Sequence, residues 1–326
     1  MTFERFRGRG PIPSADNNPL ITQSDSLRDP RGYRAGSDLA NAVNVALALQ
    51  MPLVVTGEPG TGKTQLAYRL AAELGKTEVL RFDTKSSSQA NELFYQFDSI
   101  RQFAQSQLNA AAGQPLPAAR EFVRIAAMGQ AILRTLDPAE VADKLGPVAR
   151  PWQPTSSVVM IDEIDKAPRD FPNDLLNQIE NREFSIPELG CSFRADRQFA
   201  PVVVITSNSE KQLPEPFLRR CVYHHIEFPA DQAEIEEILG ARLERTNLKG
   251  QAYREALEFI FKLRAHATLV KKPSTSELLD WLRALSVAGL MSEKTIAEQR
   301  PVLETCLGTL LKISDDVKIA KSMLAA

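Results

Sequence analysis

The sequence is poor in cysteine and contains no long apolar run. Its three cysteines, Cys191, Cys221 and Cys306, lie far apart and form no CxxC pair. This spacing argues against a disulfide framework or a zinc site and favours buried thiols in a reducing compartment. The first thirteen residues lack the apolar core of a secretory signal, and the apolar runs stop well short of the roughly 18 residues that a membrane span needs. We therefore expect a cytoplasmic protein without a membrane span.

The sequence also lacks a strong net charge. It has 39 lysines and arginines against 41 aspartates and glutamates, which gives a formal net charge of −2. The total charge therefore provides no overall attraction to nucleic acid or anionic lipid, although a local basic patch would not show in it. What is present is an ordinary globular composition, with 43% hydrophobic and 25% charged residues in a chain of 326 residues. This length suffices for two domains.

Short β-branched segments alternate with helical segments through the first two thirds of the sequence. Parallel β-α-β units have this rhythm, and they form a sheet with helices on both faces. We expect an α/β fold, a three-layer αβα sandwich with a five-stranded parallel sheet, followed by a C-terminal all-helical domain. The expected strands are residues 52–56, 78–83, 156–165, 200–208 and 221–228, and the expected helices of the sandwich are residues 38–50, capped by Ser37 or Asp38, 65–75, 87–107 and 172–184.

Composition divides the chain into three parts. Residues 1–35 are rich in Arg, Pro, Gly, Asn and Ser, and we expect a partly flexible N-terminal arm there. Residues 36–229 carry the alternating pattern, with an Ala- and Pro-rich insertion over about 104–154. Over residues 230–326 the strand pattern stops and apolar residues recur with helical spacing. This change predicts a separate helical domain.

The segment Gly57–Thr64, GEPGTGKT, fits the phosphate-binding pattern G-x-x-x-x-G-K-[ST] between a predicted strand and a predicted helix. In such a loop the backbone N–H groups of about Gly60 to Thr64 surround an anion at the positive end of a helix dipole. Lys63 would contact the β- and γ-phosphates, and the Thr64 hydroxyl would ligate Mg²⁺. The alternative is a plain Gly/Pro turn, but the pattern arises by chance in about one chain in a hundred of this length.

A second motif, VVMIDEID, places acidic residues at the end of an apolar strand. Asp162 can hold a magnesium-bound water there, and Glu163 can orient and activate the water that attacks the phosphate. A helix-capping acid pair would explain the stretch if it stood alone, and we expect Asp165 to cap the next helix. The predicted ATP-binding residues are Gly57, Glu58, Pro59, Gly60, Thr61, Gly62, Lys63, Thr64, Gln65 and Asp162, and Mg²⁺ would be held by Thr64 and, through water, by Asp162.

Three further polar residues complete the predicted site. Asn208 ends the strand VVVITSN and can hydrogen-bond the attacking water or the γ-phosphate, with a turn asparagine as the alternative interpretation. Arg219 and Arg220 precede the last strand, where two arginines usually are solvated charge. In a ring of identical subunits such an arginine can reach the neighbour's γ-phosphate, an effect worth roughly three to five orders of magnitude in rate. We predict Glu163, Asn208, Arg220 and Arg219 as catalytic residues.

Together these motifs resemble the AAA+ ATPases, and within them the MoxR group and its McrB- and dynein-related relatives, over about residues 36–320. Gly57–Thr64 resembles Walker A, VVMIDE resembles Walker B, and Asn208 resembles the sensor-1 residue. LPEPFLRRC resembles the stretch with the arginine finger, whose position Arg220 matches better than Arg219. FSIPELGCSFRADRQFAP resembles the family's β-hairpin before sensor 1, and TKSSSQANELFYQF takes the place of its insert in the second helix. These inserts face a central pore in relatives, which makes them candidate substrate-contacting surfaces.

The resemblance implies Mg-dependent ATP hydrolysis by a homo-oligomeric ring, a hexamer, that remodels a protein client, commonly with a partner that carries a von Willebrand A domain. One stretch departs from the family, whose lid carries a sensor-2 arginine where LVKKPSTSELLDW has Ser and Thr. Lys271, Lys272 and Arg283 are the basic residues considered as its substitute. Two alternatives stay open, a nucleic-acid-associated motor or restriction ATPase like McrB, and a nucleotide-gated scaffold with low turnover.

Overall fold

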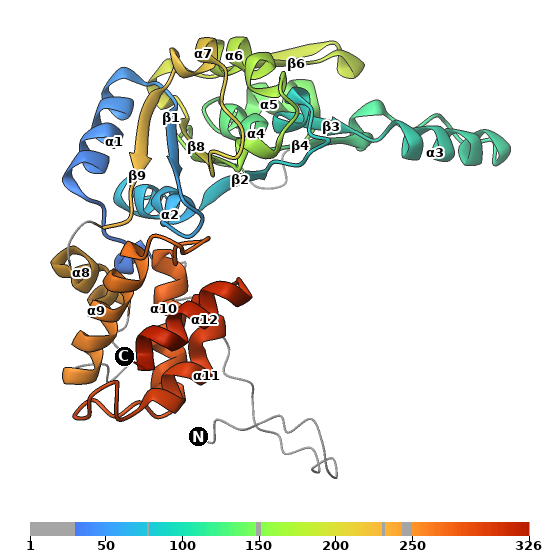
Figure 1. Cartoon of the computed structure of the whole chain (residues 1–326). Coiled ribbons are helices and arrows are strands. Elements are labelled where there is room, and N and C mark those ends of the chain that lie inside the picture. The colour runs from blue at the N-terminus through green and yellow to red at the C-terminus, as the bar shows by residue number, and fades with distance from the viewer. Residues whose placement is uncertain (1–29, 77, 148–150, 230–231, 243–249, 326) are drawn as a thin grey trace. The chain divides into compact units, whose positions relative to one another are not determined.

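The computed structural model describes residues 30–76, 78–147, 151–229, 232–242 and 250–325 (Figure 1). Most of the predicted N-terminal arm, residues 1–35, lies outside the described residues. The chain divides into two compact units. Among the described residues, the sheet unit comprises those of Ala35–Gly57 and Lys63–Ile226, and the helical unit comprises residues 30–34 and those of Glu58–Gly62 and Glu227–Ala326.

A five-stranded parallel sheet forms the centre of the sheet unit, as predicted. β1 (Leu53–Gly57) lies between β8 (Val202–Ser207) and β9 (Val222–Ile226), and β5 (Val158–Asp162) lies between β8 and β2 (Val79–Asp83). Every residue of β1 and β5 is buried, which explains why both strands begin with an unbroken apolar run. The parallel pairing brings the carboxyl ends of β1, β5 and β8 to one edge of the sheet.

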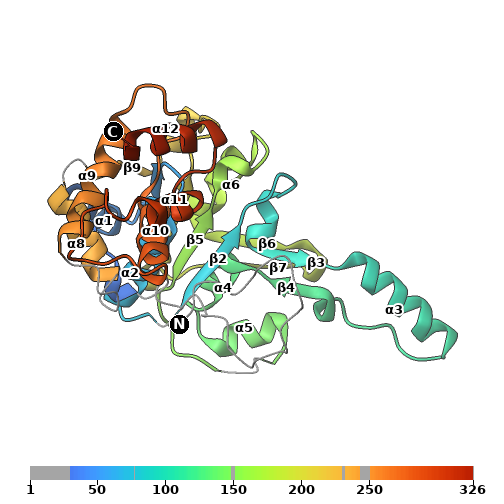
Figure 2. The same ribbon diagram turned by 60° about the horizontal axis from the view of Figure 1, so that its bottom comes forward.

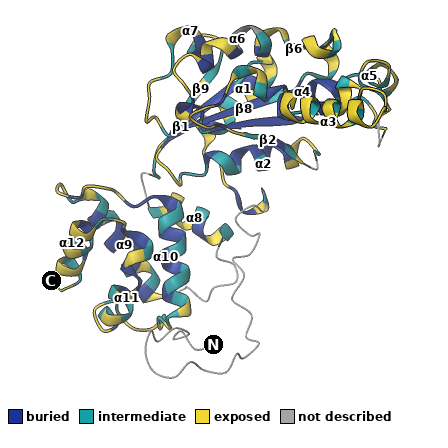
Figure 3. Cartoon of the chain, turned by 90° about the vertical axis from the view of Figure 1, so that its right-hand side faces the viewer, coloured by how far each residue is buried: buried dark blue, intermediate teal, exposed yellow. Residues whose placement is uncertain are grey.

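Helices cover the sheet and supply its core. Val54, Val159 and Ile161 belong to one buried cluster with helical residues that include Met128 and Leu175. Figure 3 shows the strands as buried between helices whose outer faces are exposed. The N-terminal cap of the first helix is Gly36 and makes no side-chain bond, so the predicted cap at Ser37 or Asp38 is wrong. The helices of this unit are α1 (Ser37–Leu49), α2 (Lys63–Glu73), α3 (Ser99–Ala111), α4 (Ala127–Leu133), α5 (Pro138–Leu145), α6 (Phe171–Asn181) and α7 (Glu215–Leu218).

A two-stranded ribbon and a helix project from the sheet unit. β3 (Tyr95–Phe97) pairs antiparallel with β4 (Val123–Ile125), and α3 lies between them in sequence. Figures 1 and 2 both show α3 extending away from the sheet. α3 has no buried residue, and its Ile100 and Phe103 are 83% and 68% exposed. We call residues 95–125 the arm of the sheet unit.

The single helix predicted over residues 87–107 is wrong. This stretch contains a 3-10 turn, Ala90–Leu93, followed by β3 and the start of α3. β3 exists because it pairs with a strand far along the chain, and such a pairing leaves no trace in local apolar spacing. The segment predicted as an insertion, about 104–154, contains α4, whose side chains belong to the main core. The hairpin predicted before sensor 1 is confirmed, since β6 (Glu183–Ile186) pairs antiparallel with β7 (Cys191–Arg194).

The helical unit contains the C-terminal helices that the sequence predicted. Their apolar faces meet around Trp281, which is fully buried. The third of these helices begins with a capping box, in which the Ser274 and Glu277 side chains each accept a backbone N–H of the other residue. None of the described helices has the length and apolar character that crossing a membrane requires. The helices are α8 (Gln232–Arg242), α9 (Gln251–Ala265), α10 (Thr275–Val287), α11 (Arg300–Leu310) and α12 (Ser314–Ala325).

Candidate active site

The phosphate-loop pattern lies where it was predicted, between β1 and α2. β1 ends at Gly57 and α2 begins at Lys63. Gly60 and Gly62 have φ angles of +83° and +92°, a left-handed backbone that residues with a Cβ rarely adopt. Lys63 is 6% exposed, and its Nζ donates to the Gly57 carbonyl oxygen at 2.8 Å. The buried Lys63 ammonium group is therefore held at the Gly57 carbonyl, where the phosphate-loop pattern predicts contact with phosphate oxygens.

The segment Glu58–Gly62 belongs to the helical unit and contacts the start of α10. The Ser276 N–H donates to the Gly60 carbonyl oxygen at 3.1 Å. A Cβ added to Gly60 would lie 2.2 Å from Ser276 Oγ and 2.5 Å from Ser274 Oγ. Gly60 is therefore required by close packing as well as by its backbone conformation.

A basic residue of the helical unit that was not predicted, Arg264, contacts the same segment. Its guanidinium lies 3.4 Å from Glu58 Oε2, and its Cζ lies 3.6 Å from the centroid of the Phe228 ring. Burial lowers the pKa of Arg264 from its ordinary value, while the charge of Glu58 opposes this change. Lys271 and Arg283, two of the predicted substitutes for the sensor-2 arginine, instead pair with carboxylates of α10.

The two predicted Mg²⁺ ligands, Thr64 and Asp162, are in contact with each other. Asp162 is 6% exposed, and its Oδ1 accepts a hydrogen bond from Thr64 Oγ1 at 3.3 Å. Thr206 Oγ1 also donates to Oδ1, at 2.5 Å, and Arg81 Nη2 lies 2.9 Å from Oδ2. These donors offset the cost of burying the charge and hold the carboxylate in one place. The oxygens of Thr64 and Asp162 suit Mg²⁺, which takes few side-chain oxygens and completes its shell with water and phosphate.

Glu163 and Asn208 meet at the same edge of the sheet. Asn208 Nδ2 donates to Glu163 Oε1 at 3.0 Å. Glu163 has a left-handed backbone with φ +57°, which costs a non-glycine residue about 1 kcal/mol or more and is frequent at functional sites. Its other oxygen, Oε2, forms a close ion pair with Lys166, and this hydrogen bond is the main cause of the raised pKa of Lys166. Both oxygens of the predicted base therefore have a donor.

Thr206 links Asp162 to Glu163, although it was not among the predicted residues. It is fully buried, and its hydroxyl donates to Asp162 Oδ1 and accepts the Glu163 N–H at 2.9 Å. One side chain thus fixes both the carboxylate and the backbone turn beside it. The sequence alone gives no signal for this role, because it depends on the strand register: β8 pairs Ile205 with Ile161, and Thr206 and Asp162 are the next residues on the two strands.

Asp165 does not cap the next helix, so that prediction is wrong. α6 begins at Phe171, with Asp170 in the capping position. Asp165 is 3% exposed, and its Oδ2 accepts the N–H groups of Asn208 at 3.1 Å and Glu210 at 3.0 Å. Its carboxylate is bonded to the loop after β8 because the N–H groups there have no strand partner.

Arg219 and Arg220 make their contacts outside the phosphate loop and the acidic motif. Arg220 Nε donates to Glu180 Oε2 at 3.0 Å, and Arg219 pairs with Glu215. The Arg220 side chain is 44% exposed, and the Arg219 side chain is 75% exposed. Neither has a hydrogen bond or ion pair with the predicted binding residues or with Glu163 in the described part of the chain. The structure therefore brings together Lys63, Thr64, Asp162, Glu163 and Asn208, but not these arginines.

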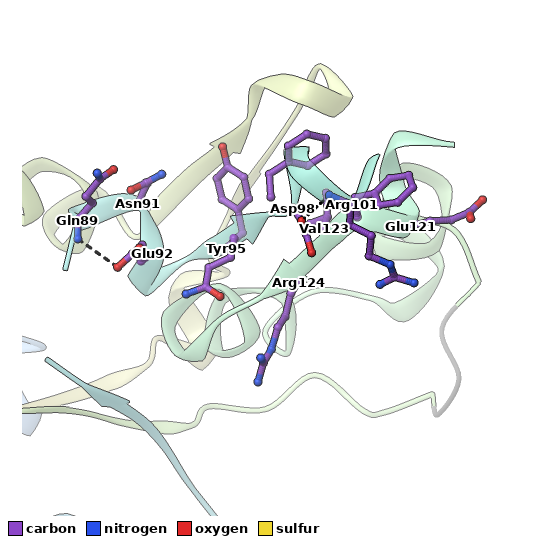
Figure 4. A pocket seen from close by; sticks show the side chains of 12 residues that line it. Gln89, Asn91, Glu92, Tyr95, Asp98, Arg101, Glu121, Val123 and Arg124 are labelled. Atoms are coloured by element: carbon purple, nitrogen blue, oxygen red, sulfur yellow. Dashed lines mark hydrogen bonds between the residues drawn. The ribbon is translucent and has the colours of Figure 1, made fainter. Parts of the chain in front are cut away.

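A separate cavity of about 650 Å³ lies at the base of the arm and contains none of the predicted site residues (Figure 4). Its charged lining residues are Glu92, Asp98, Arg101, Glu121 and Arg124. Each of the three carboxylates accepts the backbone N–H of a residue three positions away in the sequence. This mixture of charges singles out no class of ligand.

A family model described as AAA domain (dynein-related subfamily) matches residues 52–221, which is 170 of the 326 residues. The match contains both predicted motifs and ends one residue after Arg220. No relative is found among curated proteins.

Solved structures with low sequence identity also match the chain. NtrX from Brucella abortus in complex with ADP is 13% identical with a TM-score of 0.49, and the match covers 83% of this chain and 56% of NtrX. The RuvB Holliday junction branch migration motor of Thermotoga maritima is 16% identical with a TM-score of 0.44, and the match covers 86% of this chain and 69% of RuvB. The chain thus spans little more than half of the NtrX chain.

Proposed function

The chain belongs to the AAA domain family, in its dynein-related subfamily, and from that premise we propose that it hydrolyses ATP in a Mg²⁺-dependent reaction. One observation carries the proposal. The Thr64 hydroxyl contacts Asp162, while the next residue, Glu163, accepts a hydrogen bond from Asn208. The phosphate loop, the acidic strand end and the following strand end thus form one constellation, which a plain Gly/Pro turn or a helix-capping acid pair would not require.

The phosphate loop binds the triphosphate in this proposal. Backbone N–H groups of Gly60 to Thr64 and the N-terminus of α2 receive the negative charge, and the Lys63 ammonium turns from the Gly57 carbonyl to the β- and γ-phosphate oxygens. Thr64 would hold Mg²⁺ directly, and Asp162 would hold it through water. When bound, the metal would supply positive charge beside the β- and γ-phosphate oxygens.

Glu163 is the proposed general base. Its carboxylate takes a proton from the water whose oxygen attacks the γ-phosphorus, and ADP leaves with the electron pair of the broken bond. Asn208 holds Glu163 Oε1 and orients the water. Lys166 must leave Oε2 for this step. Because the side chains of Lys166 and Glu163 are 45% and 37% exposed, their ion pair is worth about 1 kcal/mol or less and opens readily.

Removing Mg²⁺ tests the proposed reaction. Phosphate release by the purified full chain with ATP is expected to fall at least about 100-fold when EDTA exceeds Mg²⁺, because the phosphate charge is then left without its metal. Added MgCl₂ should restore it, and EDTA already saturated with Mg²⁺ is the matched control. Release that persists unchanged in excess EDTA would contradict the proposal, and absent release in both conditions would favour the scaffold with low turnover.

We further propose a homo-oligomer in which Arg220 acts on ATP bound to a neighbouring copy, with Arg219 beside it. Arg220 is 44% exposed, pairs with Glu180 of its own chain and has no contact with its own predicted site among the described residues. These properties suit an arginine that works in trans. The hexameric state rests on the resemblance to the MoxR group alone.

Arg220→Ala is expected to lower turnover about 1,000-fold and to leave Mg-ATP binding nearly unchanged, since the arginine stabilises charge only in the transition state. Mixing Arg220→Ala with Glu163→Gln subunits tests its action in trans. Each variant alone is inactive, but the mixture should recover up to about a quarter of wild-type turnover, because randomly mixed interfaces then pair an intact Glu163 with an intact Arg220. Arg219→Ala is the matched comparison and should lower turnover less, because Arg220 matches the arginine-finger position better. No recovery in the mixture would place the arginine in cis.

The proposed partner is a protein rather than a nucleic acid. α3 exposes Ile100, Phe103 and Leu108, which are 83%, 68% and 65% exposed. Residues 99–119 contain a single charged residue, Arg101. Binding to a phosphate backbone needs clustered cations, whereas exposed apolar side chains on one element suit a protein surface. Remodelling of a protein client by ATP hydrolysis is therefore the function that we propose for the whole chain.

A further inference from the structure

Asp165 is a buried carboxylate to which the proposed reaction assigns no role. It is 3% exposed and lies in the 3-10 turn Ile164–Lys166, two residues after Glu163. Its Oδ2 accepts the N–H of Asn208 at 3.1 Å and the N–H of Glu210 at 3.0 Å. Its Oδ1 has no hydrogen-bond partner among the described residues. A buried charge with this arrangement is costly, which calls for a reason beyond helix capping.

The loop after β8 takes its shape from side chains. The Ser209 N–H donates to Ser207 Oγ at 3.0 Å, between the two N–H groups that Asp165 accepts. Ser209 itself has φ +61°, an uncommon backbone for a residue with a Cβ. In the described chain, no backbone carbonyl accepts the N–H of Asn208, Ser209 or Glu210. This loop is therefore fixed by Asp165 and Ser207 instead of by a strand or helix ladder.

We propose that Asp165 is a positioning residue that aims Asn208 at Glu163. Its own turn carries Glu163, and its carboxylate binds the backbone of the loop that carries Asn208, so one side chain sets the distance between the two. The 3.0 Å hydrogen bond from Asn208 Nδ2 to Glu163 Oε1 is the result of this setting. The inference rests on the proposed function, in which Glu163 is the base and Asn208 orients the water.

Asp165→Ala is expected to lower kcat about 10- to 100-fold and to change KM for ATP less than about twofold. Two backbone N–H groups lose a charged acceptor, so the loop no longer holds Asn208 in place. Asp165→Asn should keep most of the turnover, because an amide oxygen still accepts both N–H groups. Asp170→Ala is the matched control, since Asp170 is exposed and makes no side-chain cap bond.

A double-mutant cycle separates positioning from general stability. If Asp165 acts through Asn208, Asp165→Ala should cause no further loss of kcat in an Asn208→Ala background. A loss by the same factor in both backgrounds would overturn the proposal. So would an equal loss in Asp165→Asn and Asp165→Ala, because the accepted N–H bonds would then be irrelevant.

Amide hydrogen exchange supplies a readout that does not depend on hydrolysis. The amides of Asn208 and Glu210 should exchange at least about tenfold faster in Asp165→Ala than in wild type, and Asp165→Asn should stay close to wild type. Unchanged exchange at both amides would overturn the placement. A wild-type protein that releases no phosphate would refute the proposed function, whereas this exchange pattern would still show whether Asp165 fixes the loop.

Discussion

Glu163→Gln is expected to lower ATP turnover about 1,000-fold or more while Mg-ATP binding stays within about threefold of wild type. The substitution keeps the size of the side chain, and the amide oxygen can still accept from Asn208 Nδ2, as Oε1 does at 3.0 Å. An amide cannot take a proton from water, so the loss falls on kcat. Phosphate release under saturating ATP and calorimetric binding of Mg-ATP measure the two quantities separately.

The control for this change is Glu183→Gln, which removes an exposed carboxylate paired with Arg194 on the β6–β7 hairpin. It alters the charge of the chain equally but has no assigned part in the reaction, so its turnover should match wild type. If Glu163→Gln turned over ATP at the wild-type rate, Glu163 would not be the base. If it also abolished binding, the carboxylate would be acting on the nucleotide and not on the water.

Lys63→Ala is expected to weaken Mg-ATP binding roughly 100-fold, because a charged hydrogen-bond donor to phosphate is worth about 1.5–3 kcal/mol. Lys63 is 6% exposed and bonded to the Gly57 carbonyl oxygen, so its ammonium is already confined to the loop. The confinement means that little side-chain entropy is lost on binding. Titration of the purified variant with Mg-ATP, followed by calorimetry, measures the change.

Arg69→Ala provides the comparison on the same helix. Arg69 pairs with Glu73 on α2, and its side chain is 35% exposed, so its removal should leave affinity nearly unchanged. A melting temperature for Lys63→Ala close to that of wild type would show that the loss comes from the ligand contact. Wild-type affinity in Lys63→Ala would mean that the phosphates do not bind at this loop.

The features of the fold that depend on residues close together in the sequence were predictable. The strands β1, β5 and β8 each begin with an unbroken apolar run, and GEPGTGKT is contiguous, so local composition identifies them. β3 was not predicted because this three-residue strand depends on pairing with β4 and is too short to show an alternation of apolar and polar residues. Tertiary pairing decided the structure there.

The same distinction separates the predicted from the unpredicted parts of the candidate site. Asp162, Glu163 and Asn208 stand at strand ends, where motif and topology together bring polar residues to one edge. Thr206 and Asp165 act through side-chain hydrogen bonds that depend on the strand register and on the path of a loop. Arg264 reaches Glu58 across 206 positions of sequence, a contact that no spacing within one sequence reveals.

Within the arm, α3 is joined to the sheet unit through the β3–β4 ribbon of three residue pairs, and none of the α3 residues is buried. Selection for a stable core therefore places almost no constraint on the sequence of α3. The helix can diverge, or be exchanged between related chains, while the edge of the sheet that carries Asp162 and Asn208 stays intact. If the proposed function holds, a change in α3 alone would alter which proteins the chain binds without changing its ATP site.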